Sequence, residues 1–169
     1  MAKITFSGID EYAERLGTLW KEDRKIIEKA VYAGAEIVAD EIKKGLKEIP
    51  IQEGENGLPP VGTPEKPLTG ISRKQKEDLI NGFGLAPMED AFGMINTKAG
   101  FDGYGSIKTR KYPKGTPNAM LMRSIEGGTT FRKKYPVVRP AVNRARKKAI
   151  KAMQDKVDTA MQEIFEGGK

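Results

Sequence analysis

The sequence DRKIIEKAVYAGAEIVADEIKKGLKE, residues 23–48, decides the fold of this chain. Its apolar residues recur every three or four positions, which is the spacing of one face of an α-helix. This stripe consists of Ile27, Val31, Ala35, Val38, Ile42, Leu46 and, just beyond the quoted stretch, Ile49. The pattern predicts a long amphipathic helix that ends at Pro50, because proline cannot continue a helix.

The middle of this helix is slim. Small residues occupy positions Ala30, Ala33, Gly34, Ala35 and Ala39, and they allow another backbone to approach closely. Packing within the chain is the simpler interpretation. Packing against a neighbouring subunit is the alternative.

A shorter helix is predicted before residue 23. Residues 4–6 alternate like a short strand, and Ser7 with Asp10 three positions later is a variant of the capping box that begins helices. The apolar face of this first helix consists of Ile9, Tyr12, Leu16, Leu19 and Trp20.

Two long loops interrupt the chain. Residues 50–70 contain five prolines and four glycines, so neither a helix nor a strand continues through them. Residues 102–116 form a second loop, which is polar and basic. Loops of this length are uncommon in a compact domain unless they are disordered or reach a partner. Both alternatives stay open, and we expect these loops to be flexible in the free chain.

Shorter elements separate the loops. We expect a helix from Ser72 to Gly82 or Gly84, one or two strands within residues 92–101, and a helix from Pro117 to the glycines at 127–128. A last helix should run from Arg139 to about Glu166. Its apolar stripe consists of Val142, Ala145, Ala149, Met153, Val157, Met161 and Ile164.

These elements predict an α+β fold in a single domain, residues 1–169. A small antiparallel sheet should pack against the long N-terminal and C-terminal helices, with two long loops, about 50–70 and 102–116, leaving the domain.

Charge is segregated along the chain. Residues 106–151 contain fourteen Lys and Arg but one acid, Glu126, whereas the segments on either side are net negative. The last helix therefore begins basic and ends mildly acidic, an order that opposes the helix dipole. Fold stability alone does not explain this placement, although a solvated surface remains an alternative. The candidate residues for contact with DNA or an acidic partner are Arg139, Arg144, Arg146, Lys147, Lys148, Lys151, Lys108, Arg110 and Lys111.

Composition argues against most enzyme chemistry. The chain has no cysteine and no histidine, so it lacks thiolates, the commonest metal ligand and the usual general base. We expect no catalytic residues, no metal and no cofactor. Glu126 should be structural and neutralise Arg123, Arg132 or Arg139. No apolar stretch is long enough to span a bilayer, and no signal-peptide core is present, so a cytosolic protein is expected.

Two short motifs follow one another in the second half of the chain. They are Glu126-Gly127-Gly128-Thr129 and Pro136-Val137-Val138-Arg139-Pro140-Ala141. With these motifs and its order of elements, nearly the whole chain resembles the tail-completion or neck proteins of long-tailed bacteriophages, the HK-ninety-seven gene-product-ten type. It departs from them at residues 137–138, where the family often has an aromatic, and in its longer loops. The turn residues that carry the resemblance are Glu126, Gly128, Thr129, Pro136, Arg139 and Pro140.

The resemblance implies a structural, non-enzymatic virion subunit that joins head to tail. Its implied partners are further copies of itself, as a ring in the virion and a monomer when free, together with connector and tail-tube proteins. Non-specific DNA contact is compatible with it, and no membrane is involved. The implied locations are the host cytoplasm during assembly and then the neck of the virion. The alternative is a small basic nucleic-acid-binding or regulatory protein of a mobile element.

Overall fold

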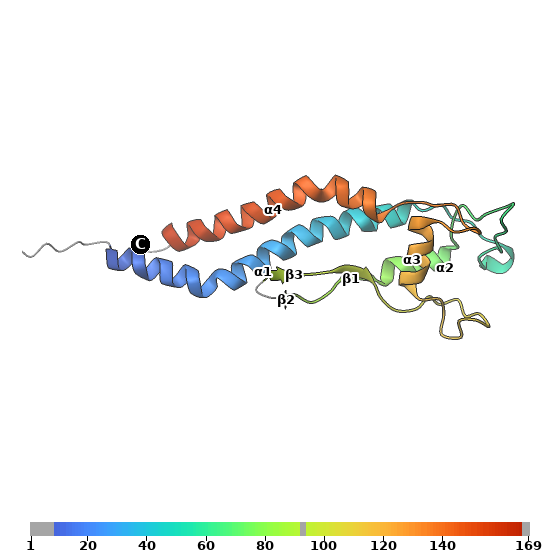
Figure 1. Cartoon of the computed structure of the whole chain (residues 1–169), viewed down its shortest axis with the longest axis horizontal. Coiled ribbons are helices and arrows are strands. Elements are labelled where there is room, and N and C mark those ends of the chain that lie inside the picture. The colour runs from blue at the N-terminus through green and yellow to red at the C-terminus, as the bar shows by residue number, and fades with distance from the viewer. Residues whose placement is uncertain (1–8, 92–93, 167–169) are drawn as a thin grey trace, which may run out of the picture.

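The computed structural model describes residues 9–91 and 94–166, with side chains placed in residues 23–90 and 94–166. It is an elongated α+β fold, as the sequence predicts, with long N-terminal and C-terminal helices (Figure 1). The elements are α1 (Ile9–Glu48), the 3₁₀ turn η1 (Glu55–Gly57), α2 (Arg73–Asn81), β1 (Phe83–Leu85), β2 (Glu89–Ala91), β3 (Met94–Asn96), β4 (Ala99–Phe101), α3 (Asn118–Gly127) and α4 (Val138–Glu166).

Helix α1 is continuous for 40 residues, which corresponds to about 60 Å. The prediction of two separate helices, meeting near residues 20–23, is wrong. The charged residues around that point are good helix formers, and no proline or glycine interrupts them. The predicted strand at 4–6 and the Ser7 cap lie outside the described residues.

Helix α4 lies beside α1 and runs back along it (Figure 1). The contact uses small residues, since Ala30 and Gly34 of α1 and Ala145 and Ala149 of α4 are buried. A Cβ atom added at Gly34 would lie 2.7 Å from Cγ and Sδ of Met153. The slim middle of α1 thus accommodates a helix of the same chain.

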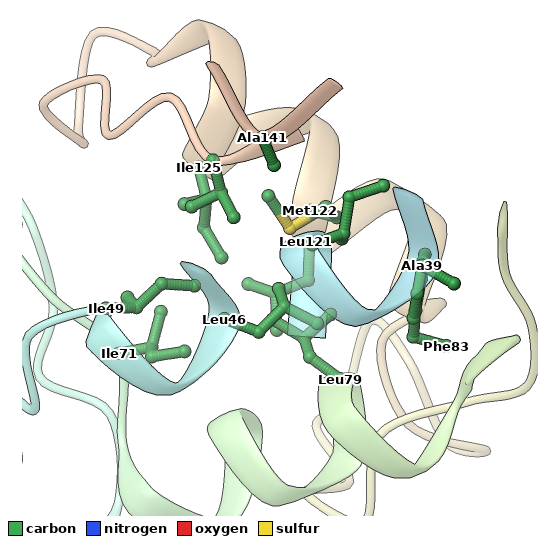
Figure 2. Close-up of a cluster of buried hydrophobic side chains, with 12 residues drawn as sticks. Ala39, Leu46, Ile49, Ile71, Leu79, Phe83, Leu121, Met122, Ile125 and Ala141 are labelled. Atoms are coloured by element: carbon green, nitrogen blue, oxygen red, sulfur yellow. The ribbon is translucent and has the colours of Figure 1, made fainter. Parts of the chain in front are cut away.

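The main core lies at the C-terminal end of α1 (Figure 2). There Leu46 and Ile49 point into a cluster completed by α2, α3, β1 and the start of α4. The predicted stripe of α1 is fully buried only at this end, and Ile27 near the other end is 44% exposed. The core cluster consists of Ala39, Ile42, Leu46, Ile49, Ile71, Leu79, Phe83, Leu121, Met122, Ile125, Val137 and Ala141.

The predicted stripe of α4 is partly wrong. Val142 and Val157 are 38% and 36% exposed, and Ala141 takes the buried position instead of Val142. Ala141, Ala145 and Ala149 repeat every four residues, and their small side chains let the two helices approach closely.

The strands form one long β-hairpin rather than one compact sheet. β1 pairs antiparallel with β4, and β2 with β3. The hairpin lies along α1 on the side away from α4 (Figure 1). The preceding helix ends before Phe83, so Gly84 is not its end; Phe83 belongs to β1, and its ring lies against that of Phe101 at a tilt of 47°, with centroids 4.9 Å apart.

The two ladders of the hairpin are offset by one residue. Leu85 lies opposite Ala99, whereas Glu89 lies opposite Asn96, so three residues face two across the gap. This is the count of a β-bulge. A hydrogen bond of 2.7 Å from the Ala86 nitrogen to the Lys98 oxygen bridges the irregular segment.

The shorter helices follow the sequence closely. Ser72 and Gln75 form a reciprocal capping box at the start of α2, which ends at Gly82. Helix α3 has Pro117 at its N-cap and ends at the predicted glycines.

Both long loops are held at their bases. The Gln52 side-chain oxygen accepts hydrogen bonds from the Thr69 and Gly70 nitrogens, at 2.8 and 3.0 Å. In the second loop, the Asp78 carboxylate accepts one of 2.7 Å from the Ser106 nitrogen. The tips are open, and Val61 is 91% exposed.

Candidate functional site

The two sequence motifs meet at the start of α4. Glu126, in the last turn of α3, accepts hydrogen bonds from the backbone nitrogens of Val137 (2.6 Å), Val138 (2.9 Å) and Arg139 (3.0 Å). The first N–H groups of a helix have no partner within that helix. Pro140 has no N–H to satisfy, and the Ala141 nitrogen donates to the Val137 oxygen. The backbone donors at residues 137–141 are therefore all accounted for.

The environment of Glu126 favours its ionised form. Partial burial is the largest single influence and opposes ionisation, but the three backbone donors and the charge of Arg139 together outweigh it. The pKa of Glu126 is consequently lowered from its ordinary value. A carboxylate at a helix N-terminus also interacts favourably with the helix dipole.

A tight turn connects α3 to α4. Gly128 has φ of +73°, and a Cβ atom there would lie 3.0 Å from the Lys134 nitrogen, so this position favours glycine. Thr129 and Arg132 exchange backbone hydrogen bonds of 2.9 and 3.2 Å. Pro136 is exposed just before α4. The motif residues thus belong to one compact structural unit.

Arg132 joins this turn to the first loop. It is 9% exposed, and its guanidinium donates to the Gly70 oxygen. Burial lowers the pKa of Arg132. The expectation that Glu126 neutralises Arg132 is wrong, because Glu126 binds backbone N–H groups and Arg132 binds a carbonyl. Of the three arginines considered, Arg139 is the one whose charge acts on Glu126.

The structure divides the predicted basic contact residues between two surfaces. Arg139, Arg144, Arg146, Lys147, Lys148 and Lys151 are exposed on α4. Lys108, Arg110 and Lys111 lie on the second loop, on the side of α3 away from α4 (Figure 1). They therefore do not form a single patch.

Arg144 has a partner within the chain. Its Nε lies 2.8 Å from Oε1 of Glu41 on α1. The hydrogen bond from Arg144 is the main reason that the pKa of Glu41 is lowered. Arg144 thus contributes to the α1–α4 contact as well as to the basic surface.

Sequence reasoning missed two features of this region. One is the capping role of Glu126, for which a signal existed: a lone acid stands a short distance before a helix whose first turn contains proline. The other is exposed apolar surface on α4, where Ile150 is 47% exposed. No sequence pattern marked Ile150, because it lies outside the predicted stripe.

Cavities and ion sites give little further chemistry. A shallow groove of about 370 Å³ lies between β4, α3 and α4, lined by Phe101, Met122, Val138, Arg123 and Arg139, among others. Within residues 23–90 and 94–166, where side chains are placed, no group of three or more acidic side chains could hold a metal ion. Of the helices in residues 9–91 and 94–166, none has the length and apolar character needed to cross a membrane.

Comparison with known proteins gives no relative. No protein-family model, curated protein or solved structure matches this chain.

Proposed function

We propose that this chain is a structural, non-enzymatic subunit of the neck of a tailed phage or prophage, acting in head–tail joining or tail completion as part of a ring. The observation that carries the proposal is the Glu126 cap. The two short motifs that give the sequence its resemblance to neck proteins are separated by six residues, and the Glu126 carboxylate joins them at the start of α4.

A small basic nucleic-acid-binding or regulatory protein of a mobile element is the second candidate. The observation that favours it is the group of exposed cations Arg146, Lys147, Lys148 and Lys151 within less than two turns of α4.

The genes that surround the coding sequence distinguish the two candidates. Neighbouring genes for portal, capsid, head-completion and tail-tube proteins are expected for a neck subunit. An isolated locus beside a repressor or recombinase would instead favour the regulatory protein.

A further inference from the structure

One exposed face of α4 changes sign halfway along the helix. Its residues are spaced by three or four positions and therefore lie on one side of the helix. The basic residues come first and the acidic residues last. The face consists of Arg144, Lys148, Lys151, Asp155, Asp158, Gln162 and Glu166, all of them exposed.

The contacts within the chain do not explain this order of charges. The helix dipole does not favour this order, because it acts mainly on the first and last turns: Lys148 and Lys151 lie too far inside α4 to be affected, and Glu166 in the last turn is disfavoured. Arg144 is bound to Glu41, but Lys151, Asp155 and Asp158 continue the face into solvent. The order is therefore better explained by a partner with the opposite order.

Exposed apolar side chains lie next to this face. Ile150 and Val157 are 47% and 36% exposed. They are seven residues apart, so they lie on the same side of α4. Together with Lys147 and Gln154 they form a row whose members are three or four residues apart: Lys147, Ile150, Gln154 and Val157. Such spacing is typical of helix–helix contacts.

We propose that a second copy of this chain packs its α4 antiparallel against this surface. In that arrangement the basic half of each helix faces the acidic half of the other, twice over, about a two-fold axis. Ile150 of each copy then lies opposite Val157 of the other, and Gln154 lies near the axis. The inference goes beyond the proposed function, because it concerns the isolated chain and holds whether or not the chain is a neck subunit. It departs from the resemblance, which implies a monomer when the chain is free.

Duplex DNA fits this surface less well. Asp155 follows Lys151 by one turn of the same face, or about 6 Å along the axis, and Asp158 follows it. An acidic half would repel phosphates, whereas it complements the basic half of another copy.

Charge reversal tests the proposal in solution. One variant carries Lys147→Glu, Lys148→Glu and Lys151→Glu, and a second carries Asp155→Lys, Asp158→Lys and Glu166→Lys. Arg144 stays unchanged because it binds Glu41. Sedimentation should show the wild type as a dimer that weakens between about 0.05 M and 0.5 M salt. Each variant alone should dimerise at least about tenfold more weakly, because like charges then face each other.

Two recombinations of these changes control for unfolding and net charge. An equimolar mixture of both variants should form a heterodimer. A chain with all six substitutions has the charge of the wild type in reversed order and should regain dimerisation. The proposal would be overturned if the wild type stayed monomeric or if the variants dimerised as well as the wild type. It would also be overturned if the chain with all six substitutions did not regain dimerisation.

Cross-linking tests the geometry separately. The chain has no cysteine, so single replacements give clean labels. Gln154→Cys should join two copies through a short bismaleimide, and Asn143→Cys, which lies far from the proposed axis, should not. A staggered head-to-tail contact would leave Gln154→Cys without self-cross-linking, and this result would overturn the two-fold arrangement.

Discussion

Glu126 stabilises the start of α4 from a different helix. A helix is usually capped by a residue of its own N-terminus, but here the carboxylate comes from the last turn of α3. Its hydrogen bonds with the backbone nitrogens of Val137, Val138 and Arg139 hold the start of α4 against the end of α3. One side chain of α3 thus helps to position α4, the helix that packs along α1.

The substitution Glu126→Gln tests this role. The neutral amide has one oxygen to offer to three N–H groups, so we expect the free energy of unfolding at neutral pH to fall by about 1–2 kcal/mol. Chemical denaturation measures the change. Glu65→Gln, at an exposed position in the first loop, is the matched control and should change stability little. An equal loss in both variants would contradict the capping role.

The difference in stability between the wild type and Glu126→Gln should depend on pH. The pKa of Glu126 is lowered in the folded state. Its contribution to stability is therefore full above the unfolded pKa of about 4.3 and is lost as the pH falls through the folded value. The difference between the wild type and Glu126→Gln should shrink below about pH 4. A constant difference down to low pH would show that the charge of Glu126 is not responsible.

At the scale of the elements, the close α1–α4 contact depends on Gly34, which has no side chain. Leucine at Gly34 would meet Met153 and should destabilise the fold by about 1–3 kcal/mol through overpacking. Met153→Ala in the same chain should restore part of that loss, which a double-mutant cycle measures. Leucine at Gly127, where an added Cβ atom meets no atom within 4 Å, is the matched control. Gly34→Leu without a loss of stability would contradict the close approach of the helices.

The two loops should be the first sites of proteolysis. Their bases are held by Gln52 and Asp78, but their tips are exposed and rich in glycine, proline and charge, so we expect them to be flexible in the free chain and ordered on assembly. Trypsin should cut first at Lys108, Arg110 or Lys111, and a Glu-specific protease at Glu55 or Glu65. Early cleavage in α1 or α4, with both loops intact, would contradict this prediction.

Long and short elements differ in how far the sequence predicts them. Helices α2 and α3 begin and end at their predicted caps or glycines because those signals are local, and α4 spans the predicted residues 139–166. The β-hairpin was only half predicted, since β1 (Phe-Gly-Leu) and β2 (Glu-Asp-Ala) consist largely of residue types that are depleted in strands. The exposed Val142 was misassigned because helical spacing alone does not fix which of two neighbouring stripes faces α1.

At the scale of the whole molecule, the basic residues 106–151 lie between two net-negative segments. These acidic segments should limit DNA binding because they repel phosphates. Any affinity for duplex DNA should be weak and independent of sequence. It should fall with salt by a slope of roughly −0.9 in log affinity per neutralised phosphate. Titration of the wild type and the Lys147→Glu, Lys148→Glu, Lys151→Glu variant with two unrelated duplexes measures this. A strong preference for one duplex would favour the regulatory alternative.

The candidate site was predicted in parts rather than as a whole. The motif residues Glu126, Gly128 and Arg139 were selected from the sequence, and they form one unit. Their connection through backbone N–H groups was not predicted, because only tertiary structure brings α3 to the start of α4. The basic residues were treated as one region, yet the fold carries Lys108 and Lys147 to different sides.

Electron microscopy of phage particles tests the neck proposal most directly. The gene is deleted from the phage or prophage that encodes it, and the lysate is compared with that of the same strain complemented with the intact gene. The account predicts that the deletion yields heads and tails that remain unjoined or tails that are incomplete, and that complementation restores whole virions. Normal numbers of complete, infectious virions without the gene would contradict it.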